Sequence, residues 1–191
     1  DTFQSVSGAG AGAVVELDSQ NHAMYENSEI QTSIHPHRIA FNVIPQIDKF
    51  TKSGYTNEEM KMVNETKKIL HQPDLKISAT CVRVPVKIGH SEAVHIEFDQ
   101  NIELEKAYSA LANSPGITLL DDPKNNQYPM PINSEYKDDV MVGRLRKDVS
   151  LPNGLVLWLS CDNLRKGAAL NAIQIAESMI EKRLIRKQRN K

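Results

Sequence analysis

The hydrophobic positions of the chain change their period several times, which predicts a mixture of strands and helices. Residues 94–98 alternate apolar and polar side chains, as a strand with one face in water does. The unbroken apolar run over 155–161 predicts a strand that is buried on both faces. Further strands are predicted over residues 39–47, where Pro45 ends the strand, over 77–84 and over 140–146.

Apolar residues at helical spacing predict three helices between these strands. One helix begins at Asn57, whose side chain can cap it, and runs to about Leu70. Two more are predicted over residues 102–112 and from Gly167 to about Arg186. Strands and helices therefore mix without strict alternation, and no repeat is visible. This pattern indicates an α+β domain with one mixed β-sheet covered by helices.

Two segments near the N-terminus allow alternative interpretations. Residues 7–13 are rich in glycine and alanine, but their spacing differs from that of a phosphate-binding loop, so we expect a turn that leads into a short helix. Residues 18–38 are polar, and the His35-Pro36-His37 sequence could suggest a metal site. Its flanking residues offer no further ligand set, so a surface loop without metal is favoured.

Composition narrows the class of protein. Lysine and arginine number 23 against 24 acidic residues, so the balance of charge gives no reason to expect nucleic acid or a membrane surface as partner. No apolar run approaches the ~20 residues of a membrane span, and no signal peptide is evident. Cys81 and Cys161 do not make a disulfide framework, so we expect a cytoplasmic protein. The chain begins at Asp1 without a methionine, and we expect it to be cut from something longer.

Arg83 and His90 are the most informative pair of polar residues. A guanidinium can grip a carboxylate with two donors, and an imidazole can transfer protons near neutral pH. The pair is seven residues apart, which would place it on opposite faces of one regular strand. Pro85 and Gly89 lie between them, and a bend there could bring both side chains to one site. The alternative is a solvated arginine and a loop histidine.

Glu58 and Lys61 are three residues apart on a predicted helix, so they share one face. Their opposite charges could bind a ligand that carries an amine and an anion, although a surface ion pair is the simpler interpretation. Neither cysteine fits a nucleophile, because Cys81 and Cys161 both fall in apolar strands and buried cysteines are usually inert.

Eight short motifs in order resemble the C-terminal catalytic and dimerisation half of the aspartate-semialdehyde dehydrogenase family. The resemblance runs from Thr2 to about Arg183. The motifs are Thr2 to Gly10, Asn42 to Ile47, Gly54 to Thr56, Glu58 to Lys61 with Glu65 to Leu70, Cys81 to Val86, Gly89 to Glu92, Val142 to Arg146, and Asp162 to Ala169.

The resemblance implies the NADPH-dependent conversion of aspartyl-β-phosphate to aspartate semialdehyde, in the route to lysine, methionine and threonine, through a thioester on a cysteine. It implies that His90 is the acid/base and that Gln4 orients the acyl group. Arg83 would bind the substrate's carboxylate, and Asn163 would meet the nicotinamide carboxamide of NADP.

The resemblance also implies that Glu58 holds the substrate's amino group and that Lys61 helps to bind phosphate. Glu59 is an alternative to Glu58, because the two acids are adjacent.

The family's nucleophilic cysteine and its dinucleotide-binding domain lie upstream of the Gln4 segment, so the resemblance implies that residues 1–191 are a substrate-binding and dimerisation domain only. We expect this chain alone to be inactive, to form a homodimer through its sheet, and to need the N-terminal domain as a partner. The apolar face of its last helix would need that domain, or another cover. The alternative function is a non-catalytic oligomerisation module.

Overall fold

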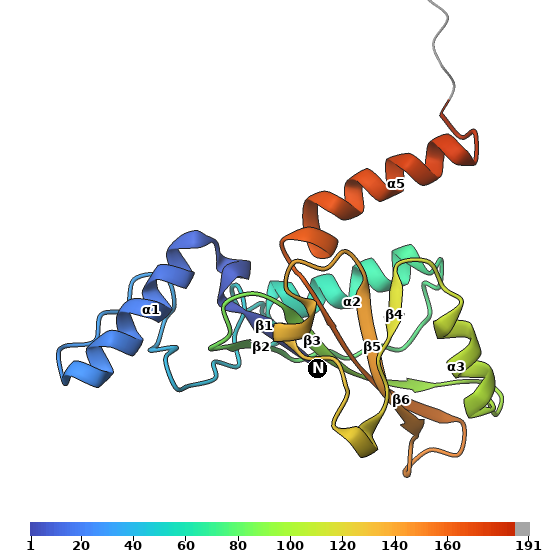
Figure 1. Cartoon of the computed structure of the whole chain (residues 1–191), viewed down its shortest axis with the longest axis horizontal. Helices are drawn as coiled ribbons and strands as arrows, with labels where there is room; N and C mark the ends of the chain where they lie inside the picture. The colour runs from blue at the N-terminus through green and yellow to red at the C-terminus, as the bar shows by residue number, and fades with distance from the viewer. Residues whose placement is uncertain (186–191) are drawn as a thin grey trace, which may run out of the picture.

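A computed structural model describes residues 1–185 and contains one mixed sheet of six strands in the order β2-β1-β3-β6-β5-β4 (Figure 1). This confirms the α+β class expected from the sequence. The strands are β1 (Thr2–Ser5), β2 (Cys81–Val84), β3 (His90–Glu97), β4 (Ile117–Leu119), β5 (Val140–Lys147) and β6 (Gly154–Cys161).

The first strand lies inside the sheet rather than at its edge. It pairs in parallel with β2, so that Gln4 is the register partner of Arg83, and antiparallel with β3. The long pairing of β3 with β6 places His90 opposite Cys161. Side chains alternate between the two faces of a sheet. Gln4 therefore points to the face covered by α2, and Phe3 points to the other face.

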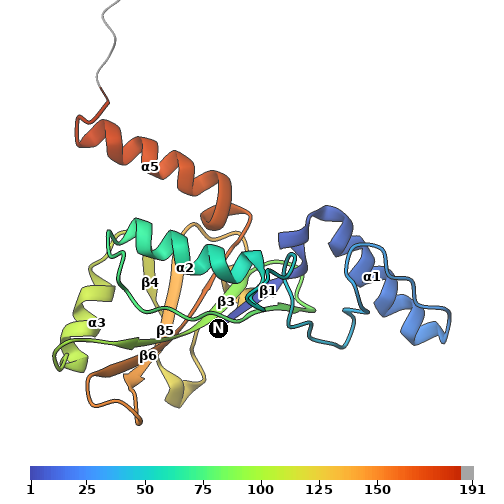
Figure 2. The ribbon, with the colours of Figure 1, turned by 180° about the vertical axis from the view of Figure 1, so that it is seen from behind.

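Helical segments surround this sheet unevenly. The two views show α2 across one face, α3 at one end, and α1 and α5 extending away from the sheet (Figure 1, Figure 2). The helical segments are η1 (Val6–Ala9), α1 (Ala11–Glu26), α2 (Asn57–Ile69), α3 (Leu104–Ala112), η2 (Pro123–Asn125), α4 (Pro131–Ser134), η3 (Arg165–Ala169) and α5 (Leu170–Glu181).

The cap of α2 is one residue earlier than the sequence indicated. The Thr56 hydroxyl accepts the Glu59 N–H, and the Glu59 carboxylate accepts the Thr56 N–H at 2.8 Å. This reciprocal pair is a capping box, which satisfies two backbone donors at once. Asn57 is therefore the first helical residue rather than the cap.

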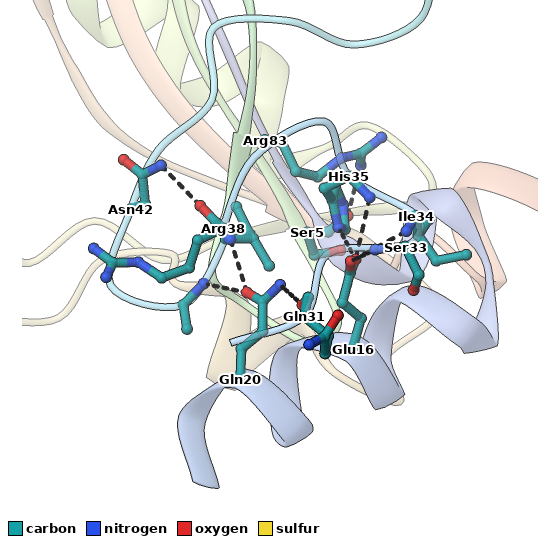
Figure 3. A network of polar contacts seen from close by, with 12 residues as sticks. Ser5, Glu16, Gln20, Gln31, Ser33, Ile34, His35, Arg38, Asn42 and Arg83 are labelled. Atoms are coloured by element: carbon teal, nitrogen blue, oxygen red, sulfur yellow. Dashed lines mark hydrogen bonds and ion pairs between the residues drawn. The ribbon is translucent and has the colours of Figure 1, made fainter. Parts of the chain in front are cut away.

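We call residues 11–47 the arm, because they form α1 and a long return loop beside the sheet. Two polar side chains of α1 hold the loop (Figure 3). The Glu16 carboxylate accepts the backbone N–H groups of Ser33, Ile34 and His35. The Gln20 side chain accepts from Ile39 and Ala40 and donates to the carbonyl of Gln31. A small core forms beneath, built from Val6, Ala13, Leu17, Ile39, Ala40 and Ile44.

The prediction of a strand over residues 39–47 is wrong. Gln20 takes the N–H groups of Ile39 and Ala40, so these cannot enter a ladder. Phe41 has a positive φ of 54°, which turns the chain. Only Ile44 remains extended against the sheet, in an isolated bridge to Arg83.

His35 also differs from its expected place in a surface loop. Its side chain is buried, and its Nδ1 lies 2.6 Å from a carboxylate oxygen of Glu16. Burial would raise the pKa of Glu16, but the hydrogen bonds from residues 33–35 outweigh it and lower that pKa. The hydrogen bond with Glu16 explains why a histidine lies inside the arm.

The C-terminal helix is interrupted where the sequence suggested continuity. Ala168 has non-helical angles inside the π-helical turn η3, so the regular helix begins only at Leu170. Its apolar side is open, with Ile173, Ile175 and Ile180 each more than half exposed. Arg186, the expected end of this helix, is outside the described residues.

The other predicted elements are present with shifted ends. The strand predicted over 77–84 is confined to β2, whereas the one predicted over 94–98 begins earlier, at His90. The run over 155–161 is a central strand, but residues 157–159 are only half-buried. α1 has 16 residues and is longer than the short helix expected after residue 13.

Candidate active site

Arg83 enters the site because β2 runs parallel to β1. Its side chain is buried, and Nη1 donates to the carbonyl of Ser5 at 2.7 Å. Burial lowers the pKa of the Arg83 guanidinium, and the charge of Glu58 opposes that effect. Arginine stays charged under such conditions. A fixed cation therefore lies at this end of the sheet, with donors that can grip a carboxylate.

His90 is placed by the turn that precedes β3. Gly89 has a φ of 97°, and a Cβ there would lie 3.0 Å from the Cα of Pro131, so the turn requires glycine. The His90 Nδ1 accepts the backbone N–H of Ser5 at 3.1 Å. Burial and the charge of Arg83 lower the pKa of His90 to about 4, so the ring is neutral at pH 7.

Gly8 lies between these two side chains. A Cβ on Gly8 would be 2.7 Å from Nη1 of Arg83 and 3.1 Å from both Cε1 and Nε2 of His90. The guanidinium and the Nε2 edge of the imidazole therefore both lie against Gly8, around the same position. The bend expected between Arg83 and His90 brings them together, and the interpretation as a solvated arginine and a loop histidine does not fit their burial.

Gln4 connects this part of the site to α2. Its amide donates to the Glu58 carboxylate at 3.4 Å, and Glu58 pairs with Lys61 at 3.5 Å. Lys61 is more than half exposed, so its contact with Glu58 is a surface ion pair. The Glu58 carboxylate is thus close enough to act on the charge of Arg83, and the exposed ammonium of Lys61 lies on the other side of Glu58.

Glu59 has a different environment from its neighbour. One of its oxygens accepts the N–H of Thr56 at 2.8 Å, and the other accepts the N–H of Cys81 at 3.1 Å. Both bonds are buried, so they tie the start of α2 to β2. Glu58 alone of these two acids faces Gln4, which favours it over Glu59 as a substrate contact.

Asn163 follows β6 and closes the site from the opposite side. The buried Asp162 accepts the N–H groups of Leu164 and Arg165 and shapes this turn. The Asn163 Oδ1 accepts the N–H of Gly89 at 2.9 Å, and its amide group contacts Ser7. One N–H of the amide is left for another partner. A single hydrogen bond to a carboxamide is thus compatible with the structure.

The two cysteines have the character expected of packing residues. Burial raises the pKa of Cys81 and raises that of Cys161 to about 11. Both thiols are free and stay protonated at neutral pH. Neither is therefore activated as a nucleophile.

Three residues that help to build the site had no predicted role. Ser5 contacts both Arg83 and His90, Ser7 contacts Asn163, and Gly8 lets Arg83 and His90 approach because it has no Cβ. All three lie within four residues of Gln4, so their only signal was their place in a segment of small residues.

Within residues 1–185, no group of three or more His, Cys, Asp or Glu side chains could hold a metal ion. None of the helices described here is long and apolar enough to cross a membrane.

Comparison with known proteins identifies close relatives. The model of the family "Semialdehyde dehydrogenase, dimerisation domain" matches residues 1–166. The aspartate-semialdehyde dehydrogenase of Bacillus subtilis is 53% identical over 192 residues, which cover 96% of this chain and 56% of the relative. That of Aquifex aeolicus is 50% identical, covering 96% and 54%. The chain thus spans about half the length of the curated relatives that it matches.

Solved structures agree with this result. Aspartate semialdehyde dehydrogenase II of Vibrio cholerae complexed with ASA has a TM-score of 0.90 and 45% identity, over 94% of this chain and 53% of that one. The Candida albicans enzyme with NADP has a TM-score of 0.64 and 26% identity, over 96% and 50%.

Proposed function

We propose that this chain, which belongs to the semialdehyde dehydrogenase family through its dimerisation domain, forms the substrate-binding half of an aspartate-semialdehyde dehydrogenase. The reaction is the NADPH-dependent reduction of aspartyl-β-phosphate to the semialdehyde, in the biosynthesis of lysine, methionine and threonine. The observation that best supports this proposal is that Arg83 and His90 both lie beside Gly8. Both free cysteines suit a reducing cytoplasm.

Each polar group in the site has a chemical role in this proposal. Arg83 grips the substrate's α-carboxylate through its fork of donors. Glu58 accepts the α-ammonium group, and Lys61 attracts the phosphate. Gln4, which contacts Glu58, orients the acyl group beside the ammonium site. His90 forms a hydrogen bond to the acyl oxygen, on which negative charge develops during the reaction.

The remaining chemistry comes from outside these residues. Cys81 and Cys161 are protonated, so the nucleophilic thiolate belongs to the preceding half of the enzyme. NADP supplies or takes up the hydride when it is bound. The free N–H of the Asn163 amide can donate to its carboxamide. The open apolar side of α5 packs on the preceding domain in this proposal.

The test is turnover by the full-length enzyme with matched histidine variants. His90→Ala is expected to lower kcat by about 10²- to 10⁴-fold, the usual contribution of a proton-transfer residue. His95→Ala is the control, because His95 is exposed on the same strand and pairs with Asp148. Equal activity of both variants would contradict the role of His90. No reduction of NADP with semialdehyde and phosphate in the wild type would overturn the proposed reaction.

A non-catalytic oligomerisation module is the second candidate, and the uncovered face of the sheet supports it. Phe3 and Trp158 stack there with ring centroids 5.4 Å apart. A cavity of about 340 Å³ lies beside Trp158, Tyr128 and Met130. We propose that this face forms the homodimer. Sedimentation of the 191-residue chain tests it, and a monomer at every concentration would refute it.

A further inference from the structure

The hydrogen bond between Ser5 and His90 fixes where the imidazole carries its proton. The backbone N–H of Ser5 points at Nδ1 over 3.1 Å, and an N–H can only donate. Nδ1 must therefore be the acceptor. In a neutral imidazole the single proton then resides on Nε2. With a proton on Nδ1, two N–H donors, those of Ser5 and His90, would face each other without an acceptor.

Three side chains close a ring of hydrogen bonds behind this contact. The ring runs from Ser7 to Ser5 at 3.0 Å, from Ser5 to the Asn163 Oδ1 at 3.1 Å, and from the Asn163 amide back to Ser7 at 3.0 Å. The Ser5 hydroxyl also lies 3.0 Å from Nδ1 of His90, where the backbone N–H of Ser5 already requires an acceptor.

Asn163 is hydrogen-bonded to two residues that position the imidazole of His90. Its Oδ1 accepts from the Ser5 hydroxyl and from the N–H of Gly89 at 2.9 Å. Ser5 donates to the ring of His90, and Gly89 is the residue that precedes it in the chain. The Asn163 amide oxygen therefore holds both Ser5, which donates to His90, and Gly89, which precedes His90 in the chain.

We propose that Ser5 and Asn163 are positioning residues that hold neutral His90 with its proton on Nε2. The consequence for catalysis rests on the proposed function. Nε2 lies against Gly8, next to the Arg83 guanidinium. His90 therefore meets the reacting acyl oxygen as a hydrogen-bond donor. Before it can accept a proton at Nε2, its own proton must move to Nδ1 and the bond from Ser5 must break.

The first experiment observes the tautomer directly. The 191-residue chain is labelled with ¹⁵N, and the imidazole nitrogens of His90 are assigned at pH 7 through their long-range couplings to ring protons. The expected spectrum shows an unprotonated Nδ1 and a protonated Nε2. A protonated Nδ1, or an average of both tautomers, would overturn the proposal without any activity measurement.

Two variants of Asn163 separate positioning from cofactor contact. Positioning uses Oδ1 as an acceptor, whereas a contact to the carboxamide uses the amide N–H. Asn163→Ala removes both, and Asn163→Asp keeps only the acceptor. The expected result is a mixed tautomer in Asn163→Ala and the Nε2–H form in Asn163→Asp. Asn125→Ala is the control, because Asn125 is bonded locally to Asp122 at the surface.

Kinetics of the full-length enzyme give the second measurement. Asn163→Ala is expected to lower kcat by up to about 100-fold, as misplaced reacting groups do. Asn163→Asp should recover most of that loss. A rise in KM for NADP that is equal in both variants, with kcat unchanged, would show a cofactor contact and refute positioning. An inactive wild type would refute the proposed function alone, because the spectrum still decides the tautomer.

Discussion

Adjacent acids at the start of α2 provide a sharp test, because Glu58 and Glu59 have opposite surroundings. Glu59→Ala leaves the N–H groups of Thr56 and Cys81 without their partner at 2.8 and 3.1 Å. A buried donor left unsatisfied costs about 1–3 kcal/mol. Two such donors predict a loss of about 2–6 kcal/mol. That is a large fraction of the ~5–15 kcal/mol that stabilises a typical protein.

Glu58→Ala is the matched control for this loss. Its carboxylate is partly exposed, and its partner Lys61 is more than half exposed. Such surface ion pairs contribute about 0–1 kcal/mol. The two variants make the same change at neighbouring helical positions, so helix propensity cancels between them. We therefore expect Glu58→Ala to unfold almost as the wild type does.

The assay is urea unfolding of the chain, followed by circular dichroism. With a slope of about 2 kcal/mol per M, the Glu59→Ala midpoint should fall by about 2 M. Glu58→Ala should instead raise KM for the amino-acid substrate in the full-length enzyme. Equal unfolding midpoints, or a larger shift for Glu58→Ala, would refute the assignment of Glu59 to structure and Glu58 to substrate.

Three further predictions concern other parts of the molecule. Gly8→Ala should lower activity in the full-length enzyme with little change in unfolding, because its Cβ would lie 2.7 Å from the Nη1 of Arg83; wild-type kinetics would contradict this packing. His90 should titrate near pH 4 by NMR. The unfolded chain takes up this proton near pH 6.5, so stability should fall as pH falls from about 6.5 to about 4, by about 3 kcal/mol in all, and a normal titration would refute the effect. Glu16→Ala should release the arm, seen as faster amide exchange at residues 33–35, since it removes their acceptor; unchanged exchange would show that His35 and the loop are held otherwise.

The fold class could be predicted because each long element has its own hydrophobic period. Four strands of the sheet, α2 and α3 all appear near their expected places, whereas the short strands β1 and β4 were not predicted. The strand predicted over residues 39–47 failed because a distant side chain accepts the backbone N–H groups there. Gln20 takes the N–H groups of Ile39 and Ala40 from 19 and 20 residues away. The local pattern of apolar residues cannot predict a hydrogen-bond partner so far along the chain.

Only part of the site could be predicted from the sequence, for a related reason. The types and spacing of Arg83 and His90 suggested chemistry, and the glycine between them suggested a bend. Their approach to Gly8 and Ser5 depends on the parallel pairing of β1 with β2, which no local pattern indicates. Choosing Glu58 over Glu59 needed the contact of Glu59 with Cys81.

The inner position of β1 has a consequence for folding. Its partners β2 and β3 lie far along the chain, and β3 pairs in turn with β6, which ends at Cys161. Loops of this length must close before the pairings stabilise them, so such topologies fold slowly. Residues 2–5 do not have both of their strand partners until the chain up to β3 is in place. Ser5 can reach Asn163 only after β6 has also joined the sheet, and a chain with β1 misplaced loses its site and the strand between β2 and β3 together.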